Sequence, residues 1–217
     1  MNGHHAWEDI VKLGASLFGR RLTFGRTGNI SIRDGDRILI TPTNTGLGSL
    51  AGTRPASIGI DGTHHDGPPP SKEAFLHAAM YRARPEALAV VHLHSTNAVA
   101  VSCLTGLDVA DALPPLTAYY AMRVGRLPLL PYYRPGDPAL RPVAEQAALR
   151  HHALLLANHG PIAAAADLSS AADVVEEIEE TARIFLRLHG LQWNALTPAQ
   201  IADIRSWRNP VSEPADA

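Results

Sequence analysis

The stretch that decides the fold is ALAVVHLHSTNAVA, residues 87–100, in which two histidines close a short apolar run. The valine-rich run is typical of a buried β-strand. Side chains at positions i and i+2 of a strand point to the same face, so His92 and His94 are predicted to share one face, about 7 Å apart along the backbone. Two imidazoles at that spacing can bind one metal ion. A pair of hydrogen-bonded structural histidines is the alternative.

A third histidine follows a second apolar run, in ALLLANHG, residues 153–160. His159 together with His92 and His94 would give three neutral imidazoles, the ligand set of an open catalytic zinc site. Nitrogen ligands also suit manganese, iron or nickel, so the residues leave the metal open. Glu73 is the candidate for proton transfer, because it lies at a predicted helix start just before the HxH strand. Compensation of the helix dipole is its alternative role.

The remaining strands are predicted from alternation and turn residues. NISIRDGDRILIT, residues 29–41, is predicted to form a hairpin around Asp34-Gly35, and residues 56–61 another short strand. The stretch 114–142 holds seven prolines and is expected to be irregular or an edge strand.

Helices are predicted at four places. The first covers residues 6–20, the second begins at Ser71 as N-cap and ends before Pro85, and a third is capped by Ser95 or Thr96. A long helix over residues 169–190 is expected to use Ser170 and Asp173 as its capping pair and Gly190 as its C-cap. Together these elements predict one α/β domain with a largely antiparallel sheet over residues 1–207, followed by a frayed tail, 208–217.

Composition narrows the function classes. The chain has 217 residues, 46% of them hydrophobic and 18% charged, which is typical of a globular protein. A net charge of −2 gives no basic footprint for nucleic acid, and no run approaches the roughly 18 apolar residues of a membrane helix. The single cysteine and the acidic residues near the start favour a cytoplasmic protein over a secreted one.

Three donor-rich turns accompany the histidines. Glycine lets backbone N–H groups approach an anion, and a helix start attracts one. A cation such as Lys72 at a helix start opposes the dipole unless an anion binds there. Ordinary turns are the alternative. The residues that these turns offer to an anion are Gly28, Asn29, Ser31, Thr43, Asn44, Thr45, Ser71 and Lys72.

The segments GRTGNIS, ITPT, PSKEAFLHAAMY, VVHLHSTNAVA and LLLANHG resemble, in this order, the motifs of the class II aldolase and adducin-head family. The resemblance covers about residues 6–190. It implies α/β/α layers around a central, mainly antiparallel sheet, and a homotetramer with sites at subunit boundaries. It further implies one divalent metal per subunit, commonly zinc, bound by His92, His94 and His159. Glu73 matches the family's acid/base glutamate, and we also consider it as a fourth candidate metal ligand in the resting state. The positions that match the family's substrate-phosphate site are Gly28, Asn29, Thr43, Asn44, Ser71 and Lys72.

Within that family, residues 113–140 are most similar to the 3-oxo-tetronate 4-phosphate decarboxylases. This similarity implies metal-dependent decarboxylation of such a sugar-acid phosphate through an enediolate, with dihydroxyacetone phosphate and CO2 as products. The segment after Gly190 has no tyrosine, unlike fuculose-phosphate aldolases, so Tyr119 and Tyr120 become candidate proton donors beside a packing role. The alternatives are a phosphoketose aldolase, a sugar-phosphate epimerase, a non-catalytic adducin-like assembly module and an iron oxygenase.

Overall fold

The computed structural model describes residues 3–208. Its centre is an eight-stranded sheet in the order β4-β3-β2-β1-β5-β8-β7-β6, in which every pair is antiparallel except β6 with β7. The strands are β1 (Asn29–Asp34), β2 (Arg37–Ile40), β3 (Ala56–Gly59), β4 (His64–Asp66), β5 (Ala89–His92), β6 (Leu129–Leu130), β7 (Ala153–Leu156) and β8 (Gly160–Ala165). The predicted antiparallel α/β architecture is thereby confirmed, with the strand before the HxH pair at its middle.

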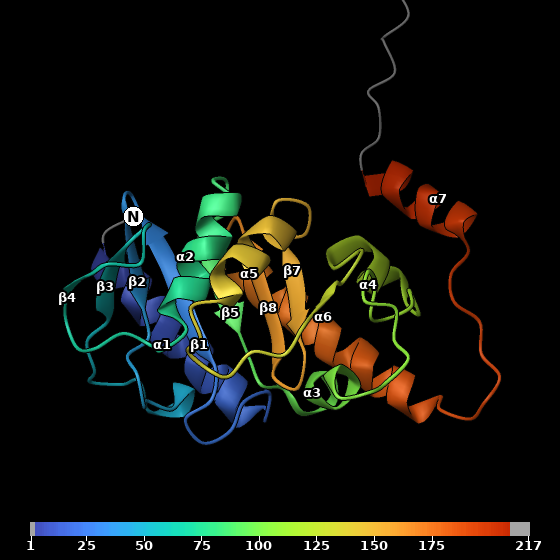
Figure 1. Ribbon diagram of the computed structural model, residues 1–217, viewed down its shortest axis with the longest axis horizontal. Helices are drawn as coiled ribbons and strands as arrows, with labels where there is room; N and C mark the ends of the chain where they lie inside the picture. Colours follow the sequence, from blue (N-terminus) through green and yellow to red (C-terminus); the bar gives the residue numbers. More distant parts are fainter. Residues whose placement is uncertain (1–2, 209–217) are drawn as a thin grey trace, which may run out of the picture.

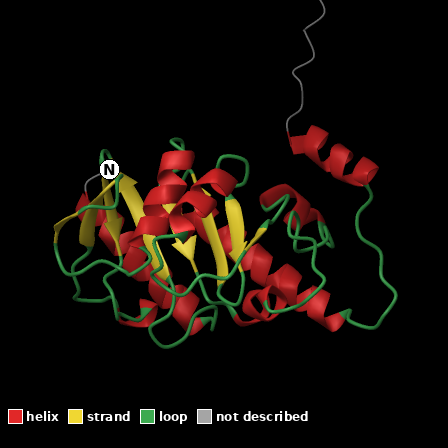
Figure 2. Ribbon diagram, in the orientation of Figure 1, coloured by secondary structure: helices red, strands yellow, loops and turns green. Residues whose placement is uncertain are grey.

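Helices cover both faces of this sheet (Figures 1 and 2). Their bounds are α1 (Gly3–Gly19), α2 (Ala74–Ala83), α3 (Thr96–Ser102), α4 (Ala118–Arg123), α5 (Leu140–Ala148), α6 (Leu168–Arg187) and α7 (Pro198–Arg208), with a 3-10 turn, η1, at Leu47–Ser49. α2 packs with α5 on one face, while α1 and α6 cover the other. This gives the three layers that the family resemblance implied. None of the helices in the described part of the chain has both the length and the apolar character needed to span a membrane.

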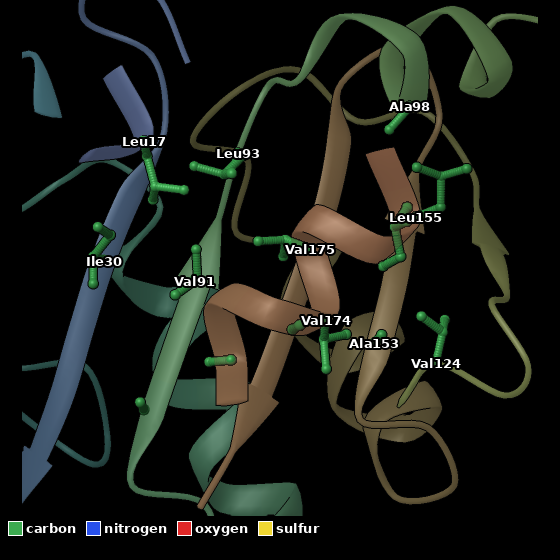
Figure 3. Packing of buried hydrophobic residues seen from close by; sticks show 14 of the residues in the cluster. Leu17, Ile30, Val91, Leu93, Ala98, Val124, Ala153, Leu155, Val174 and Val175 are labelled. Atoms are coloured by element: carbon green, nitrogen blue, oxygen red, sulfur yellow. The ribbon is translucent and has the colours of Figure 1, made fainter. Parts of the chain in front are cut away.

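The alternation of the central strands explains the two layers of core. On β5, Ala89 and Val91 pack toward α1 and α6, whereas Val90 packs toward α2 and α5. Figure 3 shows Val91 of β5 and Leu155 of β7 beside Val174 and Val175 of α6. Because both faces of these strands are buried, they appear in the sequence as continuous apolar runs.

Several predicted helix ends are wrong, for local reasons. α2 begins at Ala74, because residues 71–73 form a turn in which Ser71 Oγ accepts a hydrogen bond from the Glu73 N–H at 3.3 Å; Ser71 is therefore no N-cap. At α6 the cap is Asp167, whose carboxylate accepts from Ser170 N at 2.7 Å, instead of the pair Ser170 and Asp173. The same helix ends with Leu188 at the C-cap, two residues before Gly190.

α3 begins at Thr96, as predicted, but the hydroxyl of its N-cap residue Ser95 makes no capping bond. The carboxylate of Glu179, on α6, takes that place: it accepts from Asn97 N at 3.0 Å, Asn97 Nδ2 at 2.7 Å and Ala98 N at 2.8 Å. Glu179 is buried, so these contacts tie the segment after His94 firmly to α6.

The proline-rich stretch contains the predicted edge strand, β6. It also contains the short helix α4, which was not predicted because the prolines around it favoured irregular structure. The hairpin turn lies at Gly35-Asp36, one residue later than expected. Helices α5 and α7 were not predicted. The predicted tail, 208–217, lies outside the described residues apart from the last residue of α7.

Candidate metal centre and substrate pocket

Four side chains from distant parts of the chain meet at one point. The Nε2 atoms of His92, His94 and His159 lie 3.0 to 3.4 Å from one another. Glu73 places Oε1 2.8 Å from His159 Nε2 and Oε2 3.4 Å from His92 Nε2. The four candidate ligand atoms all lie within 4.8 Å of one another. The structure thus brings together every residue that the sequence predicted as a metal ligand.

The end of β5 and the turn between β7 and β8 place the three histidines. His92 is the last residue of β5, and His94 lies just beyond the strand with its imidazole still facing that of His92. His159 sits in the turn between β7 and β8, where Asn158 adopts a left-handed backbone with φ of 57°. The next residue, Gly160, allows this turn to approach β5, since a Cβ there would lie 2.3 Å from the Leu93 carbonyl oxygen. The absence of a side chain at residue 160 therefore lets the turn between β7 and β8 pack against the end of β5.

Hydrogen bonding sets the tautomer of His92. Its Nδ1 lies 2.8 Å from the carbonyl oxygen of Pro161, which can only accept, so Nδ1 carries the proton. In its neutral form, His92 would direct the lone pair of Nε2 at the other two imidazoles. Metal-binding histidines commonly have this arrangement, with the second nitrogen bonded to a carbonyl.

Electrostatics favour the ligand forms of Glu73 and His94. Burial, together with His92 and His159, lowers the pKa of His94 to about 3, so its imidazole is neutral near pH 7. Burial alone would raise the pKa of Glu73, but the neighbouring His92 and His159 outweigh it and hold that pKa well below the usual range. Glu73 in turn raises the pKa of His92 against the effect of burial. A neutral histidine beside an ionised glutamate fits a divalent cation by donor chemistry.

Asn29 links the first strand to this cluster. It pairs with His92 in the register of β1 and β5, and its Nδ2 donates to Glu73 Oε2 at 2.8 Å. On its other side, Asn29 Oδ1 accepts from Nε2 of the buried His77. Burial lowers the pKa of His77 to about 3. Sequence analysis missed His77, although its place four residues after Glu73, on one helix face, was a usable signal.

A polar pocket of about 150 Å³ opens beside the cluster. All six predicted phosphate-binding residues line it: Gly28, Asn29, Thr43, Asn44, Ser71 and Lys72. Glu73 and His94 of the four-residue cluster also line this pocket, so the two predicted halves of the site adjoin each other. Arg26 lines it as well and was overlooked, although it belongs to the GRTGNIS motif. The pocket therefore offers two cationic side chains, Arg26 and Lys72.

The two tyrosines lie elsewhere in this chain. Tyr120 is fully buried among the residues that face α6, and its hydroxyl donates to the Leu113 carbonyl at 3.4 Å. Tyr119 is 59% exposed, with its ring 5.5 Å from the Arg123 guanidinium carbon. Neither side chain lines the pocket, so one chain alone does not bring a tyrosine to the predicted metal.

Several larger cavities among the described residues lie away from this cluster. One, of about 440 Å³, is lined by residues such as Arg84, Arg123 and Asp173, and another, of about 490 Å³, by residues of α1 and α6 such as Leu13 and Glu176. Among the described residues, the four-residue cluster beside the 150 Å³ pocket is the one group of side chains with metal-ligand geometry. The 150 Å³ pocket is therefore the candidate functional site because of the side chains beside it, although it is smaller than the other cavities.

Comparison with known proteins agrees with this geometry. Residues 8–186 match the model of the class II aldolase and adducin N-terminal domain. The chain belongs to this family. It is 45% identical over 200 residues to the 3-oxo-tetronate 4-phosphate decarboxylase of Haemophilus influenzae, covering 92% of this chain and 95% of that one. An L-fuculose phosphate aldolase of Escherichia coli is 34% identical over 166 residues, covering 76% and 75% of the two chains.

Solved structures of the family show the same fold. The crystal structure of YgbL from Klebsiella pneumoniae, described as an aldolase/epimerase/decarboxylase, superposes with a TM-score of 0.91 at 40% identity, covering 94% of this chain and all of that one. An L-fuculose 1-phosphate aldolase superposes with a TM-score of 0.83 at 27% identity, covering 94% and 96%. The resemblance and the fold class predicted from the sequence are both confirmed.

Proposed function

We propose that this family member is a metal-dependent carboxy-lyase that converts a 3-oxo-tetronate 4-phosphate to dihydroxyacetone phosphate and CO2. The observation that carries the proposal is the cluster of Glu73, His92, His94 and His159 at the wall of a pocket with two cationic side chains. The 45% identity to a decarboxylase over nearly the whole chain supports this reaction over aldol cleavage. Zinc is the metal that three imidazoles suit best, at one ion per chain.

The reaction breaks the bond between the carboxyl carbon and the neighbouring hydroxylated carbon. CO2 leaves without the bonding electron pair, which stays on that carbon and delocalises onto the adjacent ketone oxygen as an enediolate. A divalent cation held by the three histidines supplies Lewis-acid stabilisation of this charge. One proton added to the carbon completes dihydroxyacetone phosphate.

Glu73 is the residue placed to handle that proton. Its carboxylate is ionised in the folded chain, because His92 and His159 hold its pKa well below the usual range. It therefore begins turnover as a base that takes a proton from water, and it can then deliver that proton to the carbon, so that each CO2 released consumes one solvent proton. Glu73 lines the pocket and also belongs to the four-residue cluster, so its carboxylate would lie next to both the substrate and the metal.

The other wall of the pocket suits the phosphate. Lys72 and Arg26 supply positive charge, while Ser71, Thr43 and the turn at Gly28 supply polar groups. Anchoring a phosphate away from the reacting bond orients the substrate without taking part in the chemistry. Lys72→Ala should therefore raise KM for the phosphorylated acid more than it lowers kcat, and inorganic phosphate should compete with substrate. Equal turnover of the unphosphorylated acid would refute this assignment.

One experiment decides between the lyase reactions. The metal-loaded protein is incubated with 3-oxo-tetronate 4-phosphates and, separately, with ketose 1-phosphates, and both CO2 and aldehyde are measured. The proposal expects CO2 from the acids and little aldehyde from the ketoses. The reverse pattern would establish the aldolase alternative. His94→Ala serves as the control, because it should lose bound metal and activity together.

Glu73→Gln tests the proton-transfer role. The glutamine keeps the size of the side chain but removes the transferable proton, so turnover should fall roughly 10²- to 10⁴-fold while the fold persists. Metal affinity should fall less than in His94→Ala, since three imidazoles remain. Near-normal turnover by the variant would show that a group other than Glu73 transfers the proton.

The assembly belongs to the same proposal. We infer a homotetramer with sites at subunit boundaries, supported by the exposed apolar side chains of Tyr119, Tyr132, Val109 and Phe24. In such an assembly Tyr119 would serve the site of a neighbouring subunit, whereas the buried Tyr120 would pack. Sedimentation of the purified protein measures the state, and a Tyr119→Phe variant tests the role. A cytoplasmic location is part of this proposal and agrees with the unpaired, exposed thiol of Cys103.

A further inference from the structure

A file of buried polar side chains leads away from the metal cluster into the core between α2 and the sheet. Tyr81 Oη lies 2.9 Å from Ser31 Oγ, which lies 2.7 Å from His77 Nδ1. His77 Nε2 contacts Asn29 Oδ1 at 2.5 Å, and Asn29 Nδ2 contacts Glu73 Oε2 at 2.8 Å. All five side chains are buried. The chemistry described above uses Glu73, but it leaves Tyr81, Ser31 and His77 without a role.

The file arises from two periodicities that meet. Glu73, His77 and Tyr81 follow one another at intervals of four along α2, so they lie on one helix face. Asn29 and Ser31 are two residues apart on β1, so they point to one face of the sheet. Where the two faces meet, polar groups replace the apolar contacts that surround them. Burial of so many polar atoms is costly unless each one is paired, and here each one is.

The donors and acceptors can be assigned from one end of the file. The carboxylate of Glu73 only accepts, so Asn29 must direct its amide N–H groups toward Glu73 and its oxygen toward His77. His77 therefore donates from Nε2, and its Nδ1 accepts the hydroxyl proton of Ser31. The hydroxyl of Tyr81 is left to donate to the oxygens of Ser31, Oγ at 2.9 Å and the carbonyl at 3.1 Å. Every hydrogen bond along the file points toward Glu73.

We infer that His77, Ser31 and Tyr81 are positioning residues, which fix the Asn29 amide and through it hold the Glu73 carboxylate against His92 and His159. The inference rests on the proposed role of Glu73 at the metal. An Asn29 amide turned by half a rotation would present its oxygen to the carboxylate oxygen, and the repulsion would turn Glu73 out of the cluster. His77 opposes that rotation, because its Nε2–H donor would then face the amide NH2 group, which is also a donor. The side chain of Glu73 is thereby ordered before any ligand arrives.

His77→Phe is the decisive variant, since phenylalanine fills the space but cannot donate to Asn29. Loss of a hydrogen-bond partner behind a metal ligand typically lowers metal affinity or activity about 10- to 100-fold. We expect a loss of this size in zinc affinity, measured by chelator competition on the full-length protein, and in kcat, with a smaller change in KM. His77→Gln should recover part of both, because its amide N–H can reach the same oxygen. In a Glu73→Gln background, His77→Phe should change zinc affinity less than about twofold, since Glu73 is the group through which His77 acts.

A matched control separates positioning from general destabilisation. Leu76→Ala removes a fully buried side chain from the same helix, one residue away, but removes none of the hydrogen bonds of the file. It should lower the unfolding midpoint but leave zinc affinity and kcat within about twofold of wild type. If His77→Phe does not fold, Tyr81→Phe replaces it: this variant loses one oxygen at the far end of the file, and its zinc affinity should lie between those of wild type and Glu73→Gln.

Two results would overturn the inference. One is wild-type zinc affinity and kcat in the folded His77→Phe or Tyr81→Phe variant, and the other is an equal loss in Leu76→Ala. A protein that binds zinc and responds to these variants but releases no CO2 would refute the proposed reaction and leave the inference standing. A wild-type chain that binds no divalent metal would refute both.

Discussion

Glu179 offers a sharp test of how α6 supports the metal centre. This buried carboxylate stands where the N-cap side chain of α3 would normally act, because the hydroxyl of Ser95 makes no hydrogen bond to the helix. Glu179→Ala would leave the backbone N–H groups of Asn97 and Ala98 without their acceptor. The segment that becomes loose begins two residues after His94.

The magnitude follows from the bonds lost. Each hydrogen bond to a charged group contributes about 1.5–3 kcal/mol, and loss of a helix cap costs about 1–2 kcal/mol, but these terms overlap and water can partly replace them. We therefore expect Glu179→Ala to lower the free energy of unfolding by about 2–4 kcal/mol. For a chain of this length that corresponds to a fall in Tm of about 5–15 °C. Glu179→Gln should lose roughly half as much, since one of its two side-chain acceptors becomes a donor.

Denaturant unfolding of the two variants at pH 7 measures these changes, and hydrogen exchange locates them. Amides of residues 96–102 should lose protection more than those of the sheet. The neighbouring Glu180 supplies the control: it is exposed and pairs only with Arg183 one turn later, so Glu180→Ala should change stability by less than about 0.5 kcal/mol. Equal stabilities for the Glu179→Ala and Glu180→Ala variants would refute the capping role.

Three further predictions concern the site and its scaffold. Gly160→Ala should lower the free energy of unfolding by more than about 2 kcal/mol and weaken zinc binding. The reason is that φ is +139° at this residue and the new Cβ would lie 2.3 Å from the Leu93 carbonyl oxygen. Gly19→Ala is the control: a Cβ there has open space, so stability and zinc binding should not change. Hydrogen bonds from Arg82 lower the pKa of Glu145, so this pair stabilises the fold above pH ~4.5. Its contribution, at most about 1 kcal/mol, is lost as the pH falls further. The difference in unfolding free energy between wild type and Glu145→Gln should therefore disappear on acidification. Chelation should lower the Tm of the metal-loaded protein and abolish activity, and added zinc should restore both, because a ligand of the native state stabilises it by mass action; an unchanged Tm would contradict a site built from these four residues.

The parts of the fold that local patterns encode were predicted from the sequence. The apolar runs before His92 and His159 predicted strands, and both strands are buried on both faces. The order of the motifs predicted the family. The candidate metal ligands, which the structure brings together, could be chosen from the sequence because their residue types and their places near strand ends already limit the chemistry. The phosphate turns were predicted for the same reason, from residues that stand side by side in the chain.

Local patterns failed where a distant residue replaced a near one. Ser95 and Ser71 have the right type for helix caps, but Glu179 serves α3 from 82 residues away, and the turn at Ser71 is used to line the pocket. The tyrosines next to each other at 119 and 120 are alike in sequence, and only packing against α6 separates a buried one from an exposed one.

What the sequence by itself determined is therefore the set of elements and the identity of the reactive groups, since both depend on neighbours within a few residues. What the tertiary structure decided is the partner of each group. The pairing of Asn29 with His92 across two strands brings the amide to Glu73, and the packing of α2 on β1 aligns His77 behind it. These contacts join residues 44 to 63 positions apart, and they form only when burial of the two apolar layers fixes the sheet register.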